Sequence, residues 1–88
     1  MKIEILINWI HENIVKRQNI NYDYDTSHIR TVFMHDTGIY VSNEEVNDAM
    51  LHLGYKISTP MRDLYLHFDI SSRSPALRKY RNEILGSH

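Results

Sequence analysis

The stretch that decides the fold is HDTGIYVSNEEVNDAMLHLGY, which runs from His35 to Tyr55. Gly38 predicts the end of one helix, because glycine adopts the left-handed conformation of a helix C-terminus without strain. Ser42 begins Ser-Asn-Glu-Glu, the pattern in which the first residue caps a helix and Glu45 reaches back to that cap. We therefore expect a second helix over residues 43–53 that ends at Gly54 and buries Val46, Ala49, Met50 and Leu53.

An amphipathic helix is expected before this stretch, from about Lys2 to Arg17. Apolar residues recur there at steps of three and four, which places them on one side of a helix. We expect that side to face the core, with Trp9 on its flank. Ile5 and Val15 fall on the far side, where they can meet another element or a partner. The predicted core-facing residues are Ile3, Leu6, Ile7, Ile10 and Ile14.

A strand and a helix are expected between these two regions. In Asn19–Asp25, apolar or aromatic residues alternate with polar ones, which is the two-residue period of a half-buried strand. Thr26 or Ser27 can then cap a helix over about Ser27–Asp36. The large residues of the strand are Ile20, Tyr22 and Tyr24, and the inward residues of the helix are Ile29, Val32 and Phe33.

Two strands and a final helix are expected after Gly54. Tyr55–Ser58 and Leu64–Ile70 are predicted to pair as a hairpin, joined by the proline-containing loop Thr59–Asp63. Ser74-Pro75 then begins a helix, with Ser as the cap and Pro in the first turn. That helix is expected to run to about Leu85, with Leu77, Tyr80 and Ile84 on one side.

The composition fits one small globular domain. The chain has 88 residues, of which 42% are hydrophobic and 24% are charged, and it has no cysteine, which suits a reducing interior. We place the domain at residues 1–85, with a basic C-terminal helix over 74–85, and interpret residues 86–88 as the remnant of an expression tag. Polar residues interrupt the apolar N-terminus, so neither a signal peptide nor a membrane span is predicted, and we expect a cytoplasmic protein.

The charge is unevenly distributed along the chain. Residues 1–70 hold six Lys and Arg against ten Asp and Glu, a balance of −4. Residues 71–88 hold four Lys and Arg against one Glu, a balance of +3. The net charge is only −1, so no overall basic field attracts nucleic acid, and any such attraction must be local to the C-terminal segment.

The order helix, strand, helix, tight turn, helix, strand, loop, strand resembles a winged helix-turn-helix domain. The most specific part of the resemblance is TGIYVSNEEVNDAMLHLGYKI, residues 37–57, followed by the strand LYLHFDI, residues 64–70. The same spacing is similar to the winged-helix modules of phage and poxvirus replication proteins and to small uncharacterised phage proteins of Gram-positive bacteria. The resemblance implies a regulator or replication helper of a phage or mobile element, with the third helix in the major groove of DNA and the hairpin on the backbone or minor groove.

The residues expected to contact double-stranded DNA lie on the third helix, around the hairpin and on the last helix. The third helix carries Glu44 and Asp48 on its outward side and has no Lys or Arg for the phosphate contacts that dominate affinity. A basic last helix beside a wing can instead follow the backbone without reading sequence. The candidates are Asn43, Asn47, Lys56, Arg62, Arg73, Arg78, Lys79 and Arg81, with Asn47 at the edge of the outward side.

A second hypothesis makes the chain a protein-interaction module. An exposed Leu51 beside Glu44 and Asp48 is more typical of a protein contact than of a base reader. On this hypothesis the acidic third helix docks to a host or viral protein or to a second copy of the chain. A homodimer would be compatible with both hypotheses, because many DNA-binding winged helices are dimers.

No catalytic or metal chemistry is predicted. His28 and His35 are seven residues apart and have no third ligand at a suitable spacing, and the other histidines fall on different elements. The chain contains no glycine-rich phosphate loop and no Gly-x-Ser-x-Gly turn. We therefore expect a non-enzymatic protein that uses no cofactor.

Overall fold

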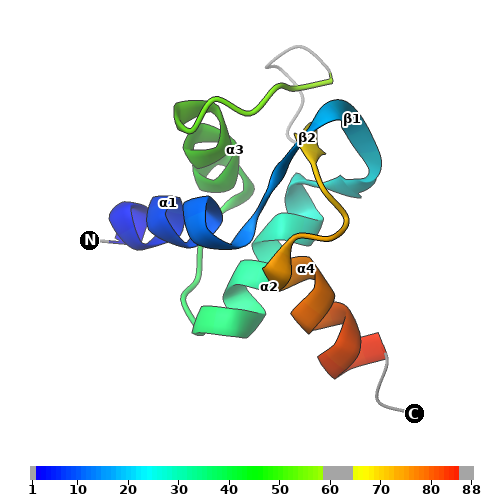
Figure 1. The fold of residues 1–88 in the computed structure, drawn as a ribbon. Helices are drawn as coiled ribbons and strands as arrows, with labels where there is room; N and C mark the ends of the chain where they lie inside the picture. The colour runs from blue at the N-terminus through cyan, green and yellow to red at the C-terminus, as the bar shows by residue number, and fades with distance from the viewer. Residues whose placement is uncertain (1, 59–64, 86–88) are drawn as a thin grey trace.

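The computed structural model describes residues 2–58 and 65–85, and the α+β class predicted from the sequence is confirmed. In the described part of the chain, four α-helices and a π-helical segment accompany a two-stranded antiparallel sheet. Figure 1 shows α1 and α3 on the left, α2 in the middle and α4 at the lower right. The elements in chain order are α1 (Lys2–Asn13), β1 (Lys16–Asp25), α2 (Thr26–Thr37), α3 (Asn43–His52), β2 (His67–Ile70), α4 (Pro75–Tyr80) and η1 (Arg81–Leu85).

Helix α1 faces the core with a slightly different side from the one predicted. Leu6 and Ile10 are fully buried, and Trp9 is only 7% exposed because its ring packs edge-on against Phe33 of α2, at 5.2 Å between centroids. This contact turns Trp9 inward from the flank where it was expected. Ile3, predicted to face the core, is 41% exposed, whereas the predicted exposure of Ile5 and Val15 is confirmed.

Helix α1 ends at Asn13, four residues before the predicted end. The N–H of Ile14 still bonds the carbonyl of Ile10 at 2.9 Å, but the N–H of Val15 donates to the hydroxyl of Ser74 at 2.8 Å. The side-chain amide of Asn13 meanwhile occupies the carbonyl of Trp9. The chain therefore leaves the helix and enters β1 at Lys16.

Strand β1 pairs with β2, and two irregularities in the register change which residues it buries. Asn21 pairs with Phe68 and is 1% exposed, and its amide donates to the carbonyl of Ile70 and the hydroxyl of Ser72. Tyr22, predicted to be half-buried, is 68% exposed. A buried amide that satisfies the backbone of β2 has taken the inward position, and the alternation predicted from residue type is wrong here.

Helix α2 is capped by Asp25, not by Thr26 or Ser27. The Asp25 carboxylate accepts the N–H of His28 at 3.0 Å. Thr26 is fully buried instead, and its hydroxyl donates to the Asn47 side chain at 2.6 Å and accepts the N–H of Leu66 at 2.9 Å. Thr26 thus joins α2 to α3 and to the residue before β2.

The turn between α2 and α3 follows the sequence prediction. Gly38 adopts φ 74°, and its N–H bonds the carbonyl of Met34 at 2.9 Å. Ser42 accepts the N–H of Glu45 at 3.1 Å, while the Glu45 carboxylate accepts the N–H of Ser42 at 2.8 Å. The predicted capping box is confirmed, and α3 buries Val46, Ala49 and Met50 against α1 and α2.

In the part of the predicted hairpin that the structure describes, residues 55–58 and 65–70, the pairing is reduced to a short contact. Residues 55–58 form no strand, and Ile57 makes an isolated antiparallel bridge with Phe68, beside a bond of 3.0 Å from the N–H of Ser58 to the carbonyl of His67. The N–H of Lys56 is occupied by the side chain of Asp69, which interrupts further pairing. Strand β2 begins at His67, and the predicted loop over 59–63 lies outside the described residues.

The last helix begins at Pro75 with Ser74 at the N-cap position, as predicted, but the Ser74 hydroxyl makes no capping bond. The hydroxyl of Ser74 donates to the carbonyl of Ser71 and accepts from Val15, so it holds α4 to the start of β1. Leu77 is buried and Tyr80 is half-buried, as expected. Ile84, expected on the same side, is 41% exposed because it lies in η1, beyond the part of the helix that packs on α2.

Candidate functional site

Three arginines surround one surface depression of about 550 Å³, and we call them the arginine cluster: Arg73, Arg78 and Arg81. Ser72 also lines the depression, and no carboxylate does. All three arginines are exposed. The guanidinium of Arg81 donates to the carbonyl of Ser72 at 3.0 Å, which holds it at the rim. The sequence predicted these residues as candidates, and the structure brings the three of them together.

The turn that carries Arg73 is anchored to β1. The N–H of Ser71 donates to the carbonyl of Val15 at 2.7 Å, and the amide of Asn21 donates to the hydroxyl of Ser72 at 2.9 Å. The N–H of Ser74 then bonds the carbonyl of Ser71 at 3.0 Å. The buried Asn21 therefore positions the segment that joins β2 to the arginine cluster.

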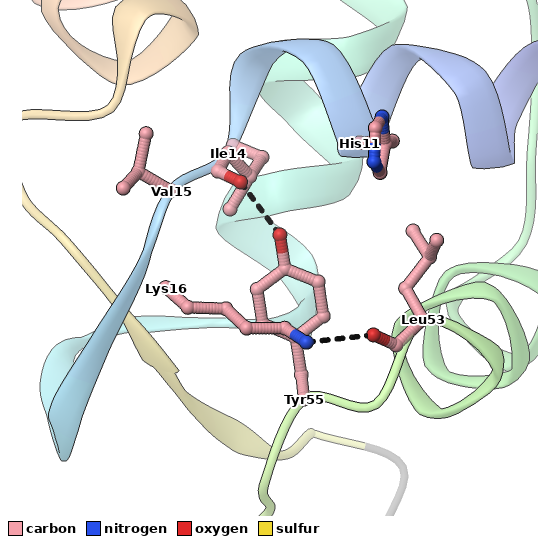
Figure 2. A pocket seen from close by; sticks show the side chains of 6 residues that line it. All are labelled: His11, Ile14, Val15, Lys16, Leu53 and Tyr55. Atoms are coloured by element: carbon pink, nitrogen blue, oxygen red, sulfur yellow. Dashed lines mark hydrogen bonds between the residues drawn. The ribbon is translucent and has the colours of Figure 1, made fainter.

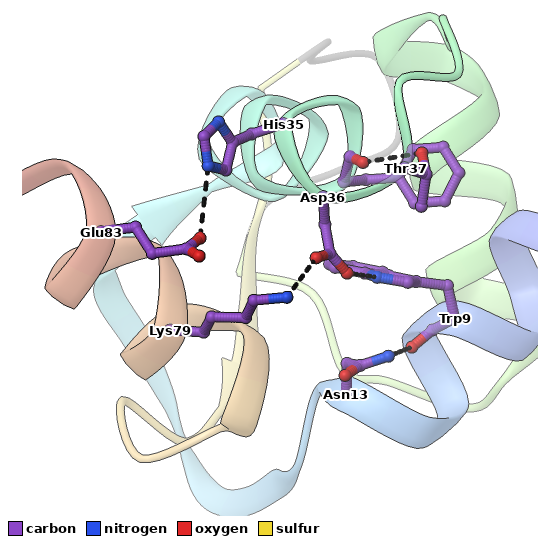
Figure 3. A network of polar contacts seen from close by, with 8 residues as sticks. Trp9, Asn13, His35, Asp36, Thr37, Lys79 and Glu83 are labelled. Carbon is purple, nitrogen blue, oxygen red and sulfur yellow. Dashed lines mark hydrogen bonds and ion pairs between the residues drawn. The ribbon is translucent and has the colours of Figure 1, made fainter.

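Lys79 does not belong to the arginine cluster. Its ammonium donates to Asp36 at 2.9 Å, and the other carboxylate oxygen of Asp36 accepts the indole N–H of Trp9 at 2.7 Å (Figure 3). The hydrogen bonds from Trp9 and then from Lys79 hold the pKa of Asp36 below its ordinary value. The bond to Asp36 also raises the pKa of Lys79. Lys79 thus ties α4 to α2 and α1.

A row of rings adds to this tie between α2 and α4. The Tyr80 ring lies 5.2 Å from His35 and 5.9 Å from His28, both edge-on. His35 also lies 3.4 Å from Glu83 of η1, as Figure 3 shows. Burial lowers the pKa of His28, against the opposing effect of Asp25. The orientation of α4, and with it the arginine cluster, is fixed by these contacts.

The remaining basic candidates lie elsewhere. Lys56 is exposed and is not among the residues that line the depression. Arg62 lies outside the described residues.

On α3 the structure separates the two groups of candidates. Asn47 is 6% exposed and accepts the hydroxyl of Thr26, so its predicted place at the edge of the outward side is wrong. Asn43 is half-buried at the first turn, next to the cap. Glu44 and Asp48 are exposed, as predicted, whereas Leu51, predicted to be exposed, is half-buried.

A groove of about 240 Å³ lies on the surface between the packed helices α1 and α3, and we call it the α1–α3 groove. Its apolar lining comes from Ile3, Ile7 and Ala49, and its polar lining from Glu45, Asp48 and His52. Lys2 pairs with Glu45 at 3.2 Å. The sequence reasoning missed this groove because it placed Ile3 in the core. Ile3 and Ile7 are one turn apart on α1 and face Glu45, Asp48 and His52 of α3. The spacing of these two isoleucines was the sequence feature that could have indicated an apolar groove.

A second depression, of about 420 Å³, lies where α1 ends (Figure 2), and its polar groups serve the fold. The phenol of Tyr55 donates to the carbonyl of Ile14 at 2.6 Å, and burial followed by the charge of Asp69 raises the pKa of Tyr55 to about 12. The ammonium of Lys16 donates to the carbonyl of Leu53 at 2.8 Å, where it satisfies the end of α3. These two hydrogen bonds join the segment after α1 to the segment after α3. The Tyr55 hydroxyl and the Lys16 ammonium are therefore already engaged in the fold.

Comparison with known proteins adds no relative. No family model matches the chain, and neither the curated proteins nor the solved structures gave a significant match. Within residues 2–58 and 65–85, His, Asp and Glu side chains nowhere gather in threes as a metal ion requires. In the same described residues, every helix is too short or too polar to span a bilayer.

Proposed function

We propose that this chain is a small nucleic-acid-binding protein that contacts the phosphate backbone of duplex DNA through the arginine cluster. The observation that carries the proposal is the meeting of three exposed guanidinium groups around one depression without a carboxylate. Guanidinium groups offer paired donors that match phosphate oxygens. Because the contacts are to the backbone, the binding is expected to be nonspecific in sequence.

The element order supports a winged-helix assignment within this proposal. Helix, strand, helix, tight turn and helix are followed by a bridge between Ile57 and Phe68, where the base of a wing would lie. In such domains the third helix commonly enters the major groove. Here the outward side of α3 carries Glu44 and Asp48, which phosphate groups would repel, and Asn47 is turned into the core. The proposed contact surface is therefore α4 and the turn before it.

The proposal predicts a specific salt dependence. Neutralising about three phosphates gives a slope of log K against log salt of roughly −2.7 on duplex DNA. Binding of this kind has a Kd of about 10⁻⁴ to 10⁻⁶ M at physiological salt, so it is best measured at low salt.

Fluorescence anisotropy of a labelled duplex at two salt concentrations tests the proposal. The double variant Arg73→Gln/Arg78→Gln removes two charges from side chains that make no hydrogen bond or ion pair in the described structure. The control Lys2→Gln/Arg17→Gln removes the same charge elsewhere on the surface. We expect the first variant to lose affinity and salt slope and the control to retain both. Absence of binding at low salt, or equal losses in the two variants, ends the proposal.

As a second function, we propose that the α1–α3 groove docks a protein. The supporting observation is an apolar floor beside Asp48, a carboxylate with no hydrogen bond or ion pair in the described structure. A photo-crosslinking residue in place of His52 at the groove should capture a partner that the same residue in place of Gln18 on β1 does not. Identical capture profiles from the two positions would remove this function.

A further inference from the structure

We infer that the chain associates with itself head to tail, the η1 segment of one copy entering the α1–α3 groove of the next. The inference rests on the second proposed function, that this groove docks a protein, and it names the protein as a second copy of the chain. The inference is based on two surfaces of the same molecule. One is the α1–α3 groove, with an acid at its edge, and the other is η1, which carries a basic residue.

The receiving surface is an apolar hollow with negative charge at its edge. Ile3 and Ile7 on α1 and Ala49 on α3 supply the apolar lining. Glu45 is already paired with Lys2, at 3.2 Å. Asp48 is exposed and makes no hydrogen bond or ion pair in the described residues, so its charge remains available to a cation on an incoming segment.

The entering surface is the outer side of η1. Ile84 is 41% exposed, and Arg81, three residues before it in η1, is exposed as well. The guanidinium of Arg81 uses one nitrogen to bond the carbonyl of Ser72 and keeps other donors for a carboxylate. An exposed apolar side chain and a cation on the same short segment complement an apolar groove next to an anion.

Charge decides between this arrangement and a symmetric one. If two copies met groove to groove, each would place its Asp48 against the Asp48 of the other, and like charges in an interface are costly. A head-to-tail contact joins the −4 body of residues 1–70 to the +3 segment of residues 71–88. Such a contact is heterologous, so it generates rings or open chains of copies.

The position of the two surfaces excludes their meeting within one molecule. In Figure 1, α1 and α3 lie on the left and η1 extends at the lower right, away from them. Ile84 and Arg81 of one copy therefore reach the groove of another copy and not their own. The groove is small, so the association is weak and depends on protein concentration.

Sedimentation of the purified chain at low salt, from about 10 μM to about 1 mM, tests the inference. The weight-average mass of the wild type should rise with concentration. Asp48→Arg and Arg81→Asp should each weaken association by about tenfold, since each places like charges in contact. An equimolar mixture of these two variants should recover association, because each unlike pair brings opposite charges together again. Glu12→Arg, an equal charge change on an exposed site of α1, should behave as wild type.

Three results would overturn the inference. The first is a wild-type chain that stays monomeric to about 1 mM. The second is association that Asp48→Arg leaves unchanged although circular dichroism shows the variant folded. The third is loss of association in both single variants without recovery on mixing, which shows that Asp48 and Arg81 do not face each other across the contact. A monomeric chain that still crosslinks another protein through position 52 would lose this inference but keep the second proposed function.

Discussion

The arginine cluster and helix α3 are the two candidate surfaces for the proposed contact with DNA, and they differ in charge. The winged-helix resemblance would assign the proposed DNA contact to α3, yet α3 exposes Glu44 and Asp48 and has no Lys or Arg. The arginine cluster has three cations and no carboxylate in its lining. The comparison teaches that the position of a helix in a fold and its affinity for phosphate are separate properties. Each must be read from its own residues.

The largest expected effect comes from substitution of Asn47 on α3, which distinguishes a structural role of this residue from a role in reading DNA bases. Asn47→Leu should lower the free energy of unfolding by about 1–3 kcal/mol, because the buried hydroxyl of Thr26 loses its 2.6 Å bond to Asn47 and, as a donor, keeps only the long 3.4 Å contact with the carbonyl of Leu66. Urea unfolding measures the loss. DNA affinity of the folded fraction should not change, and a stable variant with lost affinity would reverse the roles that we assign.

The next effect distinguishes Arg78 from its neighbour Lys79. Arg78→Gln should reduce the salt slope of DNA binding by roughly 0.9 and leave stability unchanged, because its side chain makes no hydrogen bond or ion pair in the described structure. Lys79→Gln removes the same charge but breaks the bond to Asp36, so it should lower stability more than Arg78→Gln does. Anisotropy titrations and thermal melts of both variants provide the comparison. Equal salt slopes and equal stabilities for the two variants would contradict the assignment of the arginine cluster as a distinct site.

A smaller effect is expected from the pH dependence of the tie between α2 and α4. Hydrogen bonds from Trp9 and Lys79 lower the pKa of Asp36 in the folded chain below its ordinary value of 3.8. Asp36 therefore contributes stability fully above pH 3.8, and this contribution is lost as the pH falls through its folded pKa. Asp36→Asn should remove that part of the acid dependence. Urea unfolding at pH 6 and near pH 3 measures it, and an unchanged acid dependence in the variant would contradict the assignment.

The smallest effect is expected at Glu44, on the outward side of α3. If DNA meets the arginine cluster, Glu44→Gln should change DNA affinity by less than about twofold, through long-range charge alone. If α3 enters the groove, removal of this carboxylate should strengthen binding several-fold. Anisotropy at low salt with Arg78→Gln alongside decides between the two.

The parts of the fold that depend on local chemistry could be predicted from the sequence. The capping box of Ser42 and Glu45 and the left-handed Gly38 are set by neighbouring residues, and both are confirmed. So is the start of the last helix at Pro75. In each case the cause and the effect lie within four residues of each other.

The parts that depend on distant contacts could not be predicted. Asn21 and Asn47 are polar by type, yet each is buried because a partner far along the chain satisfies its amide. Ile3 is apolar, yet it is exposed because α1 is rotated toward Phe33. Of the candidate site, the three arginines were identified from composition. Their separation from Lys79 was not, since it depends on Asp36, 43 residues away.

The contact between Trp9 and Asp36 gives this protein an internal optical reporter. Trp9 is the only tryptophan of the chain, and its indole N–H points at a carboxylate that also receives Lys79 from α4. Movement of α4 away from α2 would alter the charge beside the indole and shift its emission wavelength. The docking of the C-terminal helix can therefore be followed in solution without any added label.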